Sequence, residues 1–127
     1  MTEKPDIESR EDIEHIMRRF YDKLLSDDTI NYYFDEIIQD NRLEHHFGIL
    51  TDFWENILFY SGTYQRNAMA PHLKLHASRP FEATHFDCWL GHLNQTIDEF
   101  HSGPNAHNMK TRALSIATVM KLKTKVY

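Results

Sequence analysis

The sequence lacks the features that would place it in several large classes of protein. It has one cysteine, Cys88, in 127 residues, so an internal disulfide is excluded and a reducing, cytoplasmic location is expected. No apolar run approaches the roughly 18 residues of a membrane span, and the polar N-terminus is unlike a signal peptide. With a net charge of -5, the chain also lacks the basic excess that a nucleic-acid partner requires.

Common catalytic and metal-binding motifs are missing or incomplete. There is no Gly-x-Ser-x-Gly elbow and no Gly-rich phosphate loop, and Cys88 falls on an apolar stripe, which indicates packing. His72 and His76 have the i, i+4 spacing of zinc ligands, but the glutamate of a zinc peptidase and a cysteine pair are absent. Glu82-Ala-Thr-His85 is the single copy of a motif that a di-iron bundle needs twice.

Glycine and proline number four each, and no hairpin turn or sustained alternation of apolar and polar residues is present. Apolar side chains instead recur at steps of three and four, which predicts an all-α domain over residues 1–127 with a flexible tail over 1–8. Long helices are expected after the cap Ser9, from about Arg42 to Tyr60, from Pro80 in a first turn, and after Gly103-Pro104.

Polar side chains interrupt three of the core-facing stripes: Tyr21, His46 and Trp89. A fourth segment, Met69-Ala-Pro-His72, places a histidine on a short helix that Pro71 suits as a first-turn residue. One imidazole nitrogen of such a histidine binds iron while the other donates to a carbonyl. Nine histidines and an aromatic content of 13% are high for this length. If these four polar side chains converge, a haem with one proximal histidine and distal donors would use all of them, while an ordinary aromatic core remains the alternative that composition alone favours.

The sequence resembles the truncated haemoglobins, and more narrowly the third group of that family. The residues that carry the resemblance are Phe20-Tyr21, Phe34, His46 with Phe53-Trp54, Met69-Ala-Pro-His72, and His85-Phe86 with Trp89-Leu90, and they cover roughly residues 13–120. The resemblance implies a shortened globin fold of two helices over two, with one haem b (iron protoporphyrin IX).

The resemblance also implies the roles of individual residues. His72 would be the proximal iron ligand, with His76 one turn away as the alternative, and the distal pocket would contain Tyr21, His46 and Trp89. The side chains expected to pack on the haem are Phe20, Phe34, Leu50, Phe53, Trp54, Met69 and Phe86. Whether His46 donates a hydrogen bond, gates the pocket or coordinates iron is left open.

A haem protein of this kind would bind O₂, CO or NO. Hydrogen-bond donors beside bound O₂ slow its release, so Tyr21 and Trp89 predict a high O₂ affinity. That affinity suits redox chemistry on the ligand better than bulk oxygen transport: nitric oxide detoxification, nitrite reduction or peroxidase-like turnover, served by a reductase. A gas or redox sensor and a haem-free helical interaction module stay open as alternatives.

Overall fold

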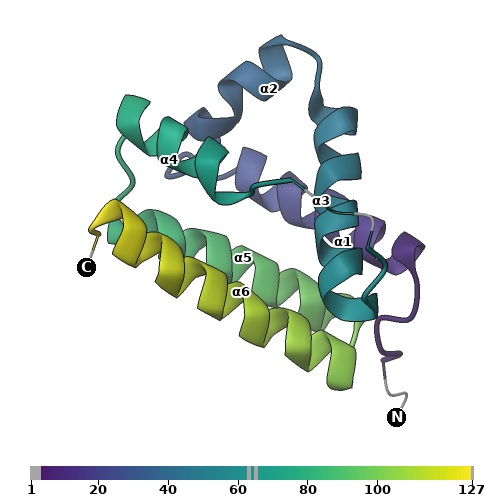
Figure 1. Ribbon diagram of the computed structural model, residues 1–127. Coiled ribbons are helices and arrows are strands. Elements are labelled where there is room, and N and C mark those ends of the chain that lie inside the picture. The colour runs from purple at the N-terminus through teal and green to yellow at the C-terminus, as the bar shows by residue number, and fades with distance from the viewer. Residues whose placement is uncertain (1–3, 63, 65, 127) are drawn as a thin grey trace.

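The structure of the chain is a computed structural model that describes residues 4–62, 64 and 66–126 (Figure 1). Its helical elements are α1 (Arg10–Leu25), the 3₁₀ helix η1 (Asn31–Phe34), α2 (Asp35–Gln39), α3 (Leu43–Phe59), α4 (Met69–Ser78), α5 (Ala83–Phe100) and α6 (Pro104–Thr124). No β-strand occurs within these described ranges, and the prediction of an all-α chain is confirmed. None of the helices in this part of the chain is both long enough and apolar enough to cross a membrane.

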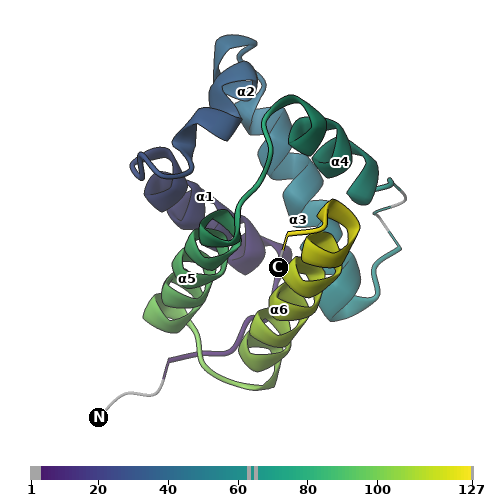
Figure 2. The ribbon, with the colours of Figure 1, turned by 90° about the vertical axis from the view of Figure 1, so that its left-hand side faces the viewer.

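Two pairs of helices make up the body of the molecule. α1 packs against α3 and also against α5, and α5 lies beside α6. Figures 1 and 2 show α1 and α3 on one side of the α5–α6 pair, while α4 packs against α6. This arrangement confirms the predicted fold of two helices over two.

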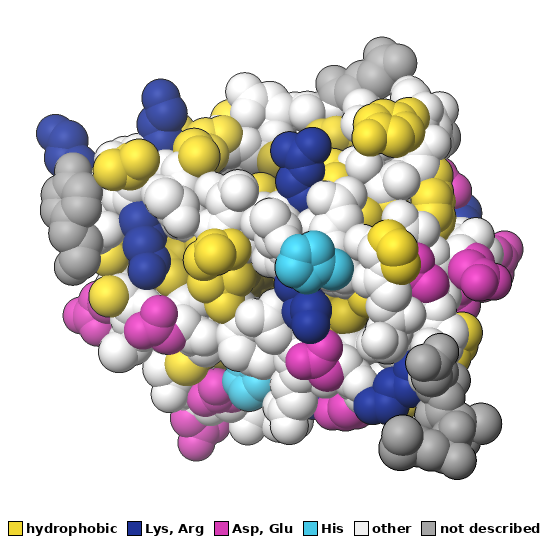
Figure 3. Space-filling view, turned by 90° about the horizontal axis from the view of Figure 1, so that it is seen from below, with side chains coloured by type: hydrophobic (Ala, Val, Ile, Leu, Met, Phe, Trp, Pro, Cys, Tyr) yellow, Lys and Arg dark blue, Asp and Glu magenta, His cyan; other side chains and the backbone are white. Residues whose placement is uncertain are grey.

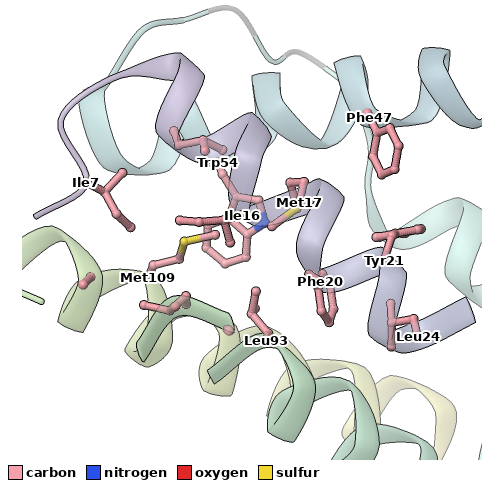
Figure 4. Close-up of a cluster of buried hydrophobic side chains, with 14 of the residues drawn as sticks. Ile7, Ile16, Met17, Phe20, Tyr21, Leu24, Phe47, Trp54, Leu93 and Met109 are labelled. Carbon is pink, nitrogen blue, oxygen red and sulfur yellow. The ribbon is translucent and has the colours of Figure 1, made fainter. Parts of the chain in front are cut away.

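The core lies where the two pairs of helices meet (Figure 4). Side chains from four helices that are at most 2% exposed come together there: Ile16, Met17, Phe20, Trp54, Leu93 and Met109. Burial of this apolar surface is the main stabilising contribution to the fold. Because the stripe of α1 is anchored along its length, Phe20 and Tyr21 are held at fixed positions near its C-terminal end.

α1 begins where the sequence predicts. The backbone N–H of Asp12 donates to the Ser9 hydroxyl oxygen at 3.2 Å, which satisfies one of the free donors of the first turn. The Asp12 carboxylate in turn accepts from the backbone N–H of Glu8 at 2.9 Å. The predicted cap is confirmed, with the reciprocal bond made to Glu8 and not to Ser9.

The start of α5 differs from the prediction. Pro80 lies outside the helix, which begins at Ala83 with Glu82 as the N-cap residue. The Nδ1 atom of His85 accepts from the backbone N–H of Glu82 at 2.8 Å, so a histidine takes the place that glutamate or glutamine usually has in a capping box. The Pro80 carbonyl accepts from the Tyr33 hydroxyl at 2.7 Å instead of joining a helix.

The segment before α1 is held against the turn between α5 and α6. The Asp6 carboxylate accepts from the backbone N–H groups of Asn105 at 3.0 Å and Ala106 at 2.9 Å, and Ile7 is fully buried. Gly103 has a φ of 140°, and a Cβ there would lie 2.6 Å from the Asp6 Cγ, so the close approach requires glycine. The expectation of a flexible tail therefore does not hold for Asp6 and Ile7, and residues 1–3 lie outside the described residues.

Replacing Asp6 by alanine is expected to lower the free energy of unfolding by about 1–2 kcal/mol, since two donors at the start of α6 lose their acceptor. These backbone hydrogen bonds outweigh the effect of burial and lower the Asp6 pKa, so the contribution is present at neutral pH and is lost as the pH falls through that pKa. Urea unfolding at pH 7 measures the change, with the exposed Glu8→Ala as control. Equal losses in the two variants would contradict this role of Asp6.

Candidate functional site

His72 lies in the first turns of α4, and its side chain is exposed. Asn67 prepares the start of this helix, because its side-chain oxygen accepts from the backbone N–H groups of Met69 at 3.0 Å and Ala70 at 3.2 Å. The His72 Nδ1 atom is 2.6 Å from the Ala68 carbonyl oxygen. A carbonyl only accepts, so Nδ1 carries the hydrogen and Nε2 keeps a free lone pair, which is the tautomer that a metal ligand needs.

His76 has the opposite tautomer. Its Nδ1 atom accepts from the backbone N–H of Phe81 at 2.8 Å, and the two rings lie 5.3 Å apart. In the neutral ring the hydrogen is then on Nε2, which has no lone pair to offer a metal ion. Of the two histidines on α4, only His72 therefore has a free Nε2 lone pair with which to bind a metal ion. A zinc site shared by both histidines is not favoured.

A second histidine predicted for the site, His46 on α3, is paired with Tyr21 on α1. The Tyr21 hydroxyl oxygen lies 2.6 Å from the His46 Nε2 atom, a short hydrogen bond. The phenol ring is buried, and the ring centroids of Phe34 and Phe47 lie 5.2 and 5.3 Å from its own in edge-on contacts. Figure 4 shows Tyr21 and Phe47. Burial raises the pKa of Tyr21, so the hydroxyl keeps its proton at neutral pH.

The surroundings of His46 keep its imidazole neutral. Burial lowers the pKa of His46 to about 4, and the positive charges of His72, Arg42 and His45 act in the same direction. The charge of His72 on α4 thus acts on the His46 imidazole of the preceding helix, α3. A neutral imidazole has one donor and one acceptor nitrogen, so it pairs with Tyr21 in either direction.

An NMR titration of His46 is expected to show a midpoint near pH 4, against about 6.5 for an unperturbed histidine. The unfolded chain takes up this proton at a higher pH than the folded chain, so the stability contributed at this residue falls as the pH drops from about 6.5 to 4. A midpoint near 6.5 in the folded protein would contradict the half-buried position of His46 beside other cationic groups.

Apolar side chains of the predicted site come from four elements and do not bury one another completely. Phe34, Leu50, Phe53, Met69 and Trp89 are all half-buried, which leaves part of their apolar surface uncovered. Three further members of the predicted set, Phe20, Trp54 and Phe86, are buried. The predicted haem-packing residues therefore divide into a buried group that belongs to the core and a half-buried group that remains available to a ligand.

Trp89 joins the two apolar clusters of the molecule. Its ring contacts Phe20 of α1 at 6.1 Å, and it packs beside Phe86 in the second cluster. The indole N–H has no hydrogen-bond partner among the described residues. A donor in that state is suited to a ligand that enters from outside the chain.

These observations fit a flat, largely apolar group that contains a metal ion. The Nε2 lone pair of His72 suits a divalent iron, and half-buried aromatic and aliphatic side chains suit a macrocycle. Tyr21, His46 and Trp89 each carry an uncharged hydrogen-bonding group. A separate hollow of about 500 Å³ at the start of α6 is lined by Lys4, Asp98, His101, His107 and Lys110 and includes none of the predicted site residues.

The structure also contains a second tyrosine–histidine contact that the sequence did not indicate. The Tyr32 hydroxyl lies 2.9 Å from the His85 Nε2 atom, while His85 Nδ1 accepts from the Glu82 backbone. His85 thereby links η1 to the first turn of α5. The position of His85 three residues after Glu82 was the available signal, since capping boxes have that spacing.

The chain is similar to known proteins in both sequence and structure. A family model described as bacterial-like globin matches residues 6–125. The group 3 truncated haemoglobin ctb of Campylobacter jejuni is 25% identical over 112 residues, which cover 87% of this chain and 86% of that protein. The crystal structure of the group III truncated haemoglobin from Campylobacter jejuni matches with a TM-score of 0.84 at 24% identity, over 95% of this chain and 94% of that one.

Proposed function

The chain belongs to the bacterial-like globin family, and we propose that it binds one haem b through the Nε2 atom of His72 and takes up O₂, CO or NO. The observation that carries this proposal is the hydrogen bond from His72 Nδ1 to the Ala68 carbonyl, at 2.6 Å between the heavy atoms. This bond fixes the ring orientation, leaves Nε2 free and raises its basicity. When bound, the haem supplies an iron that accepts a diatomic ligand.

In this proposal Tyr21 and His46 lie on the side of the haem where the small ligand binds, opposite His72. Their hydrogen bond leaves the Tyr21 proton free for a ligand only if His46 Nε2–H is the donor and the phenol oxygen the acceptor. We assign this direction, in which His46 orients the phenol and the phenol donates into the pocket. Because His46 stays neutral well below pH 7, the arrangement persists across the physiological range.

Trp89 adds a second donor to the pocket, and Phe34, Leu50, Phe53 and Met69 supply apolar contacts that exclude water. Hydrogen bonds to a ligand that gains negative charge slow its release. The proposed role is therefore high-affinity ligand binding that serves NO handling or other redox chemistry of the ligand. Peroxidase-like turnover and gas or redox sensing are the competing uses of the same site.

The test is titration of the purified chain with haemin. One equivalent is expected to produce a Soret band, and the band of the reduced protein is expected to shift when CO is added. A chain that retains its helical circular dichroism but takes up no haemin would contradict the proposal and favour a haem-free interaction module.

A further inference from the structure

The charge of the chain is divided between two regions of opposite sign. All 19 Asp and Glu residues precede residue 100, together with nine Lys and Arg residues. Residues 100–127 contain no Asp or Glu and five cations: Lys110, Arg112, Lys121, Lys123 and Lys125. The net charge of -5 therefore hides a basic C-terminal helix on an acidic body.

The outer face of α6 combines these cations with uncovered apolar side chains. Leu114, Val119 and Leu122 are 57%, 44% and 58% exposed. Figure 3 shows the molecule from below, where dark-blue Lys and Arg side chains lie among yellow hydrophobic ones along the upper left. Leu114 and Leu122 lie about 80° apart around the helix, and Val119 lies about 60° beyond Leu122, so the three side chains share the broad exposed side of α6.

The polar side chains between these apolar residues need no outside partner. The Ser115 hydroxyl donates to the Thr111 carbonyl at 3.2 Å, and the Thr118 hydroxyl donates to the Leu114 carbonyl at 2.9 Å. Both hydroxyls are therefore satisfied within α6, and another surface can cover them without loss of hydrogen bonds. The middle of the outer face can therefore be covered by another protein, and lose its contact with water, without leaving these hydroxyls unsatisfied.

Cations border this centre on both sides. Within the described part of the chain, Arg112, Lys123 and Lys125 form no ion pair, whereas Lys110 pairs with Asp98 at 2.7 Å. An apolar centre with a charged rim is the usual anatomy of a protein–protein contact. The rim here selects a partner whose contact surface is acidic.

The inner face of the same helix reaches the proposed haem site. Ile116 and Met120 pack with Phe86 of α5 and Met69 of α4, the residue that begins the helix of His72. A protein seated on the outer face of α6 is therefore separated from this cluster by one helix, about 10–12 Å across with its side chains. That is a suitable position for an electron donor.

We propose that the outer face of α6, defined by Leu114, Val119, Leu122 and the cations Arg112, Lys123 and Lys125, is the docking surface for a small acidic electron-transfer protein that reduces the haem iron. The proposal rests on the haem function proposed above. One electron passes from the reduced donor to ferric iron, which becomes ferrous, and no bond is formed or broken.

The size and chemistry of the surface favour this partner over two others. Three exposed aliphatic side chains suit the small, transient contacts of redox proteins, which are steered by charge. Two copies of the face would bring the cations Arg112, Lys123 and Lys125 of one copy against those of the other, which opposes a symmetric dimer. A membrane-surface helix carries a broad apolar face with aromatic residues, whereas this face has two leucines and a valine separated by Ser and Thr.

The experiment uses the haem-loaded protein with a reduced, acidic plant-type ferredoxin as the one-electron donor, followed by stopped-flow absorption. The rate constant of reduction is expected to fall as salt is added. Arg112→Glu and Lys123→Glu are each expected to lower it about tenfold at low ionic strength, because each replaces an attractive charge with a repulsive one. Arg19→Glu, an exposed change of equal charge on α1, is expected to alter it less than about twofold.

Several results would overturn the docking proposal. One is an equal effect of all three substitutions, and another is a rate independent of salt. A third is binding to phosphatidylserine vesicles that is lost in Lys123→Glu while its reduction rate is unchanged, which would assign the face to a lipid surface. All variants must take up one equivalent of haemin. Failure of the wild type to do so would instead contradict the haem function itself.

Discussion

Replacing His72 by glycine is expected to remove the iron–histidine bond and to weaken haem binding more than any other single substitution in the chain. Loss of a hydrogen-bond partner of a metal ligand alone costs about 10–100-fold in affinity, and removal of the ligand itself should cost more. The iron–histidine stretching band of the reduced protein in resonance Raman spectra is expected to disappear. Added imidazole should restore a five-coordinate spectrum, because glycine leaves space for it beside Ala68.

His76→Gly is the matched control for this experiment. It removes a histidine from the same helix, one turn away, and breaks the contact with the Phe81 backbone instead of the one with Ala68. The variant is expected to be less stable and to keep the iron–histidine band. Loss of the band in His76→Gly and its retention in His72→Gly would reverse the tautomer argument and make His76 the ligand.

Tyr21→Phe is expected to increase the O₂ dissociation rate by about tenfold to a hundredfold. A hydrogen bond to a charged acceptor is worth about 1.5–3 kcal/mol, and about 1.4 kcal/mol corresponds to a factor of ten. The phenol is buried against Phe34 and Phe47, so removal of its oxygen changes the donor and leaves the packing in place. Displacement of O₂ by CO in a stopped-flow instrument measures the rate.

Tyr32→Phe is the control for Tyr21→Phe. Tyr32 also contacts a histidine nitrogen, at 2.9 Å, but its partner is His85 at the corner between η1 and α5. Its removal is expected to leave the O₂ dissociation rate unchanged. Trp89→Phe should raise the rate as well, since it removes the second donor. Unchanged rates in both Tyr21→Phe and Trp89→Phe would show that the distal donors do not hold the ligand.

The sequence predicts the parts of this molecule that depend on local periodicity. The stripe of α1 through Ile16 and Phe20 is buried as expected, because a 3.6-residue repeat determines which side chains share a face. Ser9 caps the helix for an equally local reason. The sequence places Tyr21 and His46 on core-facing stripes but does not predict their hydrogen bond, because periodicity gives neither their distance nor their tautomers.

Other features depend on contacts between distant segments and could not be read from the chain. Asp6 accepts hydrogen bonds from residues about a hundred positions away, so nothing near it in the sequence distinguishes it from a polar tail. Pro80 suits a first helical turn, but the Tyr33 hydroxyl holds its carbonyl at the corner before α5. The apolar and polar sides of α6 differ little, so the sequence alone does not show which apolar side chains of this helix stay exposed.

The measurement that most directly tests the central claim is the infrared C–O stretching band of the reduced, CO-bound protein. The claim is that His72 binds the haem iron and that the Tyr21 hydroxyl donates a hydrogen bond to the ligand on that iron. A donor beside the CO oxygen draws electron density into the C–O antibonding orbitals, so the wild-type band is expected at a low wavenumber. Tyr21→Phe should move it upward and Tyr32→Phe should not. A band unaffected by Tyr21→Phe, or the absence of any CO complex, would contradict the account.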